Sequence, residues 1–116
     1  MQDSEKLLIF RLDNTSFAIH LNDVERIIRI VEISALPESA KYIMGVIDYH
    51  GEFIPVVDTR YIFKLPQRDF EIQDKLIVTN LSGKRIAFWV DSTDEIDEFS
   101  GIKKQVVDDR RLIWNI

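Results

Sequence analysis

Two histidines are the first residues in this sequence to consider for metal binding or catalysis. His20 and His50 lie far apart, and the chain contains no cysteine. Because zinc is usually held by several histidine or cysteine ligands, we predict neither a metal site nor a disulfide. His20 falls on the less buried face of a predicted strand, and His50 falls in a predicted turn at a contact surface.

An acidic segment over residues 91–98 suggests a second kind of chemistry, cation binding. It lacks the glycine-centred spacing of a calcium loop. We therefore interpret it as a solvated strand edge, where charge prevents pairing with the wrong partner. Its charged members are Asp91, Asp94, Glu95, Asp97 and Glu98.

The sequence lacks the usual motifs of nucleophilic catalysis and of nucleotide binding. The sequence has no glycine-rich phosphate loop and no G-x-S-x-G turn, and its four glycines leave little material for such a loop. No serine has a base that the sequence places beside it. We predict a protein that is not an enzyme and takes no cofactor.

Length and composition narrow the function further. A chain of 116 residues suits one domain, and 46 % apolar with 30 % charged residues is typical of a soluble globular protein. The net charge of −5 argues against nucleic-acid binding. No apolar run approaches the roughly 20 residues of a membrane span, and the polar N-terminus has no signal-peptide pattern. We expect a cytoplasmic protein without direct membrane insertion.

The elements that position these residues are predicted to be mostly short strands. Helical turns are expected only over residues 23–27, 38–42 and 59–63. The polar segment 64–74 is predicted to be a loop between two sheet halves. Many short strands with almost no long helix indicate an all-β barrel. Strands are predicted near residues 7–12, 17–21, 28–33, 75–80, 85–90 and 112–116, with a hairpin over residues 45–58.

The hairpin over residues 45–58 organises the chain. Gly51 supplies the positive φ that a tight turn needs. Pro55 cannot donate to a ladder, so we expect an edge strand or a bulge at that residue. Tyr49 lies in the turn, where an aromatic ring serves either a contact surface or the core.

This hairpin resembles the hallmark of CheW-like domains. Residues 45–51 read G-V-I-D-Y-H-G and residues 55–60 read P-V-V-D-T-R. The family typically reads G-V-x-N-L-R-G-x-x-x-P-V-x-D-L-R. The likeness extends over nearly all of the chain from Leu7 to Phe99 and includes Leu36-Pro37 and the strand pair near residues 75–91.

The resemblance implies an all-β fold of two SH3-like β-barrel subdomains around a shared hydrophobic core, with residues 1–116 forming a single CheW-like domain. It implies a non-catalytic adaptor that couples chemoreceptors to a histidine kinase. The cytoplasmic tip of the chemoreceptor would bind a groove between the subdomains. The regulatory domain of the histidine kinase would dock through the barrel ends.

The resemblance also marks residues for partner binding. Val24, Gly45 and Ile77 match positions that line the receptor groove. Core packing is the alternative for Val24 and Ile77, and a close backbone approach is the alternative for Gly45. His50 takes the place of the turn arginine, and Glu25 lies near the same surface. The candidate protein-binding residues are Val24, Glu25, Gly45, Tyr49, His50 and Ile77.

Three features depart from the family pattern. The turn has Asp48-Tyr49-His50 where Asn-Leu-Arg is usual, so an arginine common in the family is absent. Thr59 stands where leucine is usual. The chain ends at Ile116, where family members continue, so the C-terminal strands are expected to be missing and the open sheet edge to permit homo-oligomers.

Two other functions stay open at this point. The domain could belong to a larger or non-chemotaxis protein, such as a polar-localisation or twitching-motility protein or the regulatory part of a histidine kinase. A small-barrel enzyme would instead require a concave pocket with convergent titratable groups.

Overall fold

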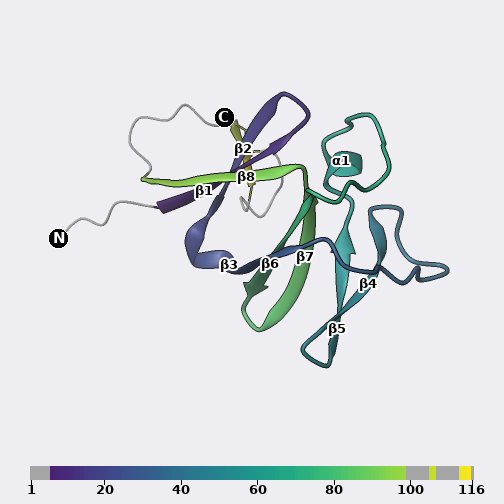
Figure 1. The fold of residues 1–116 in the computed structure, drawn as a ribbon. Coiled ribbons are helices and arrows are strands. Elements are labelled where there is room, and N and C mark those ends of the chain that lie inside the picture. Colours follow the sequence, from purple (N-terminus) through teal and green to yellow (C-terminus); the bar gives the residue numbers. More distant parts are fainter. Residues whose placement is uncertain (1–5, 99–104, 107–112, 116) are drawn as a thin grey trace.

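The computed structural model describes residues 6–98, 105–106 and 113–115, with side chains as far as residue 94 (Figure 1). Within this part of the chain the strands form a first sheet of order β8-β1-β2-β10-β9 and a second sheet of order β3-β6-β7-β5-β4. The predicted all-β class is confirmed. The strands are β1 (Lys6–Leu12), β2 (Thr15–His20), β3 (Val24–Arg29), β4 (Ile43–Tyr49), β5 (Glu52–Val57), β6 (Lys75–Leu81), β7 (Lys84–Val90), β8 (Ser92–Glu98), β9 (Gln105–Val106) and β10 (Ile113–Asn115), and the helices are the 3₁₀ helix η1 (Leu21–Asp23) and α1 (Thr59–Ile62).

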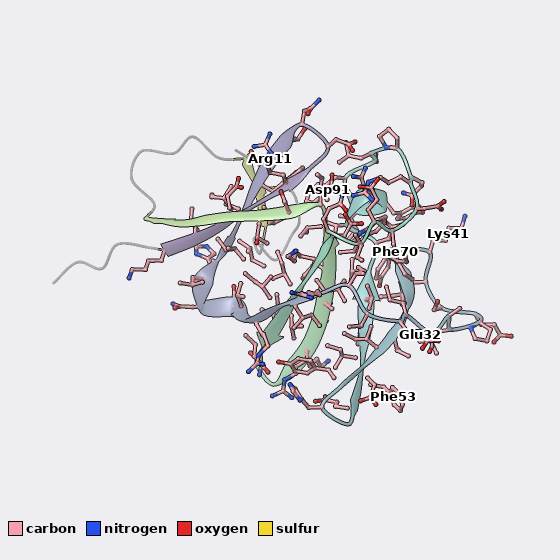
Figure 2. All side chains as sticks on the ribbon, viewed as in Figure 1. Arg11, Glu32, Lys41, Phe53, Phe70 and Asp91 are labelled. Carbon is pink, nitrogen blue, oxygen red and sulfur yellow. The ribbon has the colours of Figure 1, made fainter. Side chains whose placement is uncertain are left out.

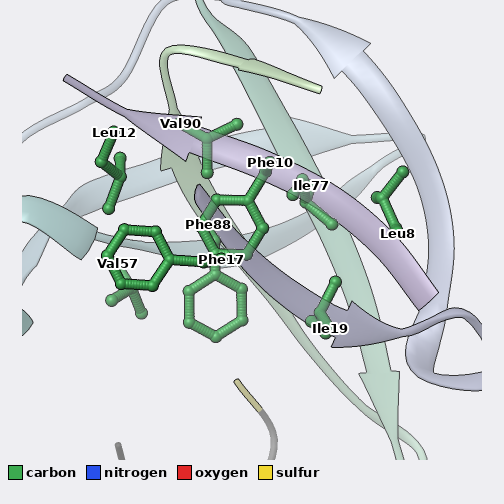
Figure 3. Close-up of a cluster of buried hydrophobic side chains, with 9 residues drawn as sticks. All are labelled: Leu8, Phe10, Leu12, Phe17, Ile19, Val57, Ile77, Phe88 and Val90. Atoms are coloured by element: carbon green, nitrogen blue, oxygen red, sulfur yellow. The ribbon is translucent and has the colours of Figure 1, made fainter. Parts of the chain in front are cut away.

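One hydrophobic core is shared by the two sheets (Figure 3). Phe10 of β1 and Phe17 of β2 stack with ring centroids 5.5 Å apart, and Ile77 and Phe88 reach the same cluster from the second sheet. Burying each such side chain contributes about 1.5–3 kcal/mol relative to leaving it in water. The other members of the cluster are Leu8, Leu12, Ile19, Val57 and Val90.

The two edge strands of the second sheet, β3 and β4, are connected through the segment that follows β3. The Ser34 N–H donates to the Val46 carbonyl and the Val46 N–H donates to the Ser34 carbonyl, both at 2.9 Å. A Cβ on Gly45 would lie 2.2 Å from the Ser34 oxygen, so the backbones meet only because Gly45 has no side chain. The close backbone approach at Gly45 is confirmed, and the SH3-like form of each barrel stays a prediction.

The β4–β5 hairpin turns at His50 and Gly51, whose φ angles are +54° and +88°. Two successive positive φ angles are the mark of the type I′ turn that fits twisted hairpins. The Gly51 N–H donates to Asp48 Oδ1 at 2.8 Å and fixes the turn. The positive φ predicted for Gly51 is confirmed.

The prediction for Pro55 is wrong. β5 lies between β4 and β7, and the bulge falls in β4 between Ile43 and Gly45. The parallel pairing of β5 with β7 covers only Val56 and Val57. Pro55 lies outside that ladder, so the missing N–H of Pro55 removes no hydrogen bond between β5 and β7.

Two of the predicted helical turns are wrong. After η1, residues 24–27 belong to β3, because Ile27 pairs with Ile77 of β6 and this pairing outweighs the local capping signal. Residues 38–42 contain turns without a helix.

The helical turn near residue 60 is confirmed by α1, where Asp58 Oδ1 accepts a hydrogen bond from the Tyr61 N–H at 3.1 Å. Residues 64–74 form a loop as predicted, but it connects two parts of the second sheet. The chain passes between the sheets at η1 and again at Asp91 instead.

The acidic segment forms β8, which pairs with β1 and ends the first sheet in the described part of the chain. This confirms the prediction of a strand edge for residues 92–98, whereas Asp91 precedes β8 and forms ion pairs with Arg60 and Arg68. Self-association through an open edge stays a prediction.

Candidate functional site

Glu25, at the beginning of β3, is the centre of a hydrogen-bonded group at one end of the second sheet. Its Oε2 accepts from the Tyr49 hydroxyl at 2.9 Å. Its Oε1 accepts from Arg85 Nε at 2.8 Å and from Asn80 Nδ2 at 3.2 Å. Arg85 Nη1 also donates to Glu52 Oε1 at 2.8 Å. These five residues are called the Glu25 network.

Each strand of the second sheet supplies one member of the Glu25 network. In sheet order these are Glu25 of β3, Asn80 of β6, Arg85 of β7, Glu52 of β5 and Tyr49 of β4. The bond between Tyr49 and Glu25 therefore connects the two edge strands by side chains. The network fixes the tip of the β4–β5 hairpin against the beginning of β3.

The charges in the Glu25 network are set by mutual hydrogen bonds. The Arg85 guanidinium, followed by the Tyr49 hydroxyl, holds the pKa of Glu25 below its ordinary value. Burial and the adjacent Glu25 carboxylate raise the pKa of Tyr49. At neutral pH the network therefore contains an ionised carboxylate held by a guanidinium and a protonated phenol.

Four of the predicted site residues lie at this end of the sheet. Glu25 comes from the beginning of β3, and its half-buried neighbour Val24 packs against the shared core. Tyr49 buries its ring and leaves its hydroxyl on Glu25, so it serves both the core and the polar surface. His50 is exposed, and its ring centroid lies 4.6 Å from that of Tyr49.

The other two predicted site residues lie elsewhere. Gly45 is packed against the backbone of Ser34, towards the far end of β4 from the hairpin tip. Ile77 is fully buried in the shared core, and on β6 it pairs with Ile27 of β3. These positions match the alternatives of backbone approach and core packing, and a role toward a partner stays a prediction for both.

Three residues of the Glu25 network, Glu52, Asn80 and Arg85, were not predicted from the sequence. No local pattern marks them, because they reach Glu25 only through the order of the strands. Phe53 is a further residue of this end: it follows Glu52 and is 71 % exposed (Figure 2). A large aromatic side chain that stays in water beside a polar group is a common feature of binding surfaces.

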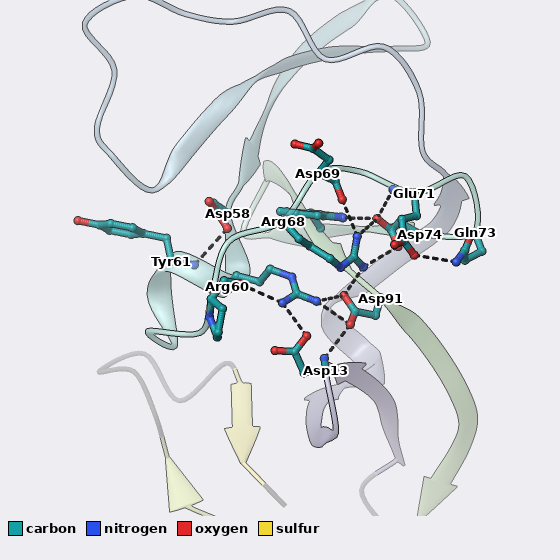
Figure 4. Close-up of polar contacts among 12 residues, drawn as sticks. Asp13, Asp58, Arg60, Tyr61, Arg68, Asp69, Glu71, Gln73, Asp74 and Asp91 are labelled. Atoms are coloured by element: carbon teal, nitrogen blue, oxygen red, sulfur yellow. Dashed lines mark hydrogen bonds and ion pairs between the residues drawn. The ribbon is translucent and has the colours of Figure 1, made fainter.

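A second polar group joins the two sheets (Figure 4). Arg60 of α1 is 1 % exposed; it donates to Asp13 Oδ1 at 2.8 Å and to both carboxylate oxygens of Asp91 at 2.6 and 2.7 Å. Arg68 donates to the same Asp91 at 2.7 Å and to both oxygens of Asp74 at 2.9 Å. These five residues are called the Arg60 network.

The Arg60 network is a structural connection. Asp13 lies in the turn between β1 and β2, and Asp91 lies where the chain passes from β7 to β8. Trp89 donates its indole N–H to Asp74 at 2.9 Å, beneath the guanidinium of Arg68. Burial opposes ionisation of Asp74, but hydrogen bonds from Arg68, the residue 71 backbone N–H and Trp89 outweigh it and lower its pKa.

Metal-binding geometry was also considered. In the part of the chain that the structure describes, no group of three or more histidine, aspartate or glutamate side chains could hold a metal ion. No helix among the described residues is long and apolar enough to span a membrane.

Comparison with known proteins identifies a family. Residues 6–107 match the family model of the CheW-like domain. The chain is 25 % identical to "Probable chemotaxis protein CheW" of Rhizobium etli, over 82 % of this chain and 61 % of that protein. It is 24 % identical to "Chemotaxis protein CheW" of Bacillus subtilis, over 83 % and 62 %, and 28 % identical to the protein of that name in Thermotoga maritima, over 74 % and 56 %.

The fold is also similar to a solved structure. The scaffolding protein TtCheW of Thermoanaerobacter tengcongensis superposes with a TM-score of 0.79 and 24 % identity, covering 85 % of this chain and 68 % of that chain. This chain spans about three fifths of the length of the curated relatives that it matches.

Proposed function

The chain belongs to the CheW-like domain family, and we propose that it is a non-catalytic, cytoplasmic adaptor that couples chemoreceptors to a histidine kinase. The observation that carries the proposal is the Glu25 network, a surface group of hydrogen-bonded charged and polar side chains with the exposed His50 ring against Tyr49. Relatives named as chemotaxis proteins support the same function.

The cytoplasmic tip of a chemoreceptor would dock at this end of the second sheet. His50 and the exposed members of the network would supply the contact surface around Glu25, and the exposed Phe53 would extend that surface at the hairpin tip. Arg85, held between Glu25 and Glu52, would keep a positive charge beside Glu25 although the turn has none. The regulatory domain of the histidine kinase would bind through another barrel end, so that the receptor state changes which arrangement of the kinase is populated.

The test is co-sedimentation of the chain with receptor-containing membranes and the histidine kinase. Glu25→Lys puts a second positive charge against Arg85, so it should abolish receptor binding while the variant still unfolds cooperatively in urea. Glu32→Lys makes the same charge change at an exposed residue outside the network and should bind as the unmodified chain does. Equal binding by both variants would refute the site. Failure of the unmodified chain to bind either partner would refute the adaptor function.

A second candidate function is that of an interaction domain in a larger or non-chemotaxis protein. The unusual turn, Asp48-Tyr49-His50, favours this alternative. Pull-down from a lysate with and without competing receptor tips would separate the two functions, because an adaptor for chemoreceptors would be displaced by those tips.

A further inference from the structure

A pocket of about 530 Å³ lies away from the Glu25 network. It lies at the end of the β4–β5 hairpin away from the turn, because its lining residue Tyr42 immediately precedes β4. At that end Ile43 pairs with Val57, whereas at the turn Tyr49 pairs with Glu52. A strand of seven residues separates the two ends by about 20 Å. The pocket is lined by Tyr42, Tyr61, Ile62, Lys64, Leu65 and Gln67.

The walls of this pocket are mostly apolar and aromatic, with Lys64 and Gln67 as the polar members. Tyr42 precedes β4 and is 47 % exposed, and Tyr61 of α1 is 45 % exposed. The ring of Tyr61 points away from the Arg60 network (Figure 4). Ile62 and Leu65 pack against the shared core and form an apolar lining. Tyrosine rings that stay half exposed over an apolar surface are typical of protein-binding sites.

The charge of the lining is positive in a chain whose net charge is −5. Lys64 is the one charged residue among the described residues that line the pocket. Lys41 precedes the lining residue Tyr42 in the sequence and is also exposed (Figure 2). A cation beside an apolar cavity is complementary to a carboxylate that adjoins a bulky apolar side chain.

The backbone at Lys64 is in a conformation that costs energy. Its φ is +60°, in the left-handed region, where its N–H donates to the Tyr61 carbonyl at 3.2 Å just after α1. Glycine is the residue that best suits such a position after a helix. A lysine there places an ammonium group at the pocket at the expense of local backbone strain.

We propose that this pocket binds an acidic peptide segment of a partner protein. One bulky apolar side chain of the peptide enters between Tyr42 and Tyr61, and an adjacent carboxylate pairs with Lys64. This binding goes beyond the adaptor function proposed above, because the pocket shares no residue with the Glu25 network.

A random twelve-residue phage-displayed peptide library, selected on the immobilised full chain, tests the proposal. We expect enriched peptides in which aspartate or glutamate adjoins leucine, isoleucine or phenylalanine. In fluorescence anisotropy, Lys64→Gly should weaken their binding about fivefold, the upper range for an exposed ion pair. Tyr61→Ala should weaken it about tenfold or more. Lys84→Ala, which removes a charge away from the pocket, should bind within about twofold of the unmodified chain.

Lys64→Gly separates binding from folding. Because glycine relieves the strained φ, the melting temperature of this variant should be unchanged or higher. Retained binding in folded Lys64→Gly would overturn the proposal, and so would a selection that yields no acidic consensus. A concentration-dependent dimer in analytical ultracentrifugation that Tyr61→Ala abolishes would assign the pocket to a second copy, and would also overturn it.

Discussion

Replacing Arg60 should weaken the connection between the two sheets. The Arg60 guanidinium is 1 % exposed and pairs with Asp13 of the first sheet and with Asp91 at the crossing between the sheets. It also donates to the Pro66 carbonyl at 3.1 Å and lies 5.6 Å from the Trp89 ring centroid. Arg60→Ala removes all of these contacts at once and leaves two carboxylates without their main partner.

The loss of stability depends on how well water or another partner can replace Arg60 at each carboxylate. Breaking a buried ion pair by removing one partner typically costs about 3–5 kcal/mol. The cost here should lie at the lower end, because the Asp13 side chain is 41 % exposed to water and Asp91 keeps its bond to Arg68 at 2.7 Å. We therefore expect Arg60→Ala to lower the free energy of unfolding by about 3 kcal/mol. For a domain of about this size, that lowers the melting temperature by about 12 °C.

Urea unfolding at pH 7 measures this loss, with the m-value expected to stay constant. Arg60→Met keeps most of the side-chain volume, so a similar loss in that variant assigns the effect to the unpaired carboxylates, with the cavity as the minor cause. Arg29→Ala, at an exposed arginine of β3, should change stability by less than about 0.5 kcal/mol. A loss below about 1 kcal/mol in Arg60→Ala would refute the assignment of Arg60 as the connection.

Three further predictions concern other residues. The pKa of Asp74 is lowered in the folded protein, so the stability that its carboxylate contributes is fully present above the ordinary pKa of 3.8 and is lost as pH falls through the lower folded pKa. Asp74→Asn should therefore flatten the acid side of a stability–pH curve measured by urea unfolding. Gly45→Ala should destabilise by more than about 2 kcal/mol in thermal unfolding, because its Cβ would meet the Ser34 oxygen, whereas Gly51→Ala, with open space around it, should cost about 1 kcal/mol. His50→Arg should tighten binding to a chemoreceptor tip in a titration, and an unchanged affinity would reduce the turn to a structural role.

Local signals predicted the parts of the fold that depend on neighbouring residues. The β6–β7 hairpin follows from Ser82-Gly83, where both residues have positive φ and the Gly83 N–H donates to the Asn80 side chain at 2.9 Å. The helix expected over residues 23–27 failed for the opposite reason. An N-cap and an acidic first turn are local, but Ile27 is placed by a strand that lies far along the sequence.

The candidate site was predicted in part for the same reason. Val24, Glu25, Tyr49 and His50 could be marked from the family motif. The atoms that hold the Glu25 carboxylate are separated from it by 24, 55 and 60 residues, at Tyr49, Asn80 and Arg85. Only the order of strands in the second sheet brings them together, and periodicity within one strand carries no information about that order.

The turn lacks the arginine that is usual in the family, and the Glu25 network affects which side chains are presented to a partner at this end of the sheet. Arg85, on a different strand, holds Glu25 at 2.8 Å and Glu52 at 2.8 Å, so the Glu25 carboxylate has a cation although the turn has none. The turn is thereby left to carry His50 against Tyr49. Because Arg85 is fixed at both ends of its guanidinium, it cannot extend toward a partner as freely as a residue in the turn could. A partner docked at this surface would therefore meet His50 together with the Glu25–Arg85 pair, so substitutions at His50 and at Glu25 should both change its binding.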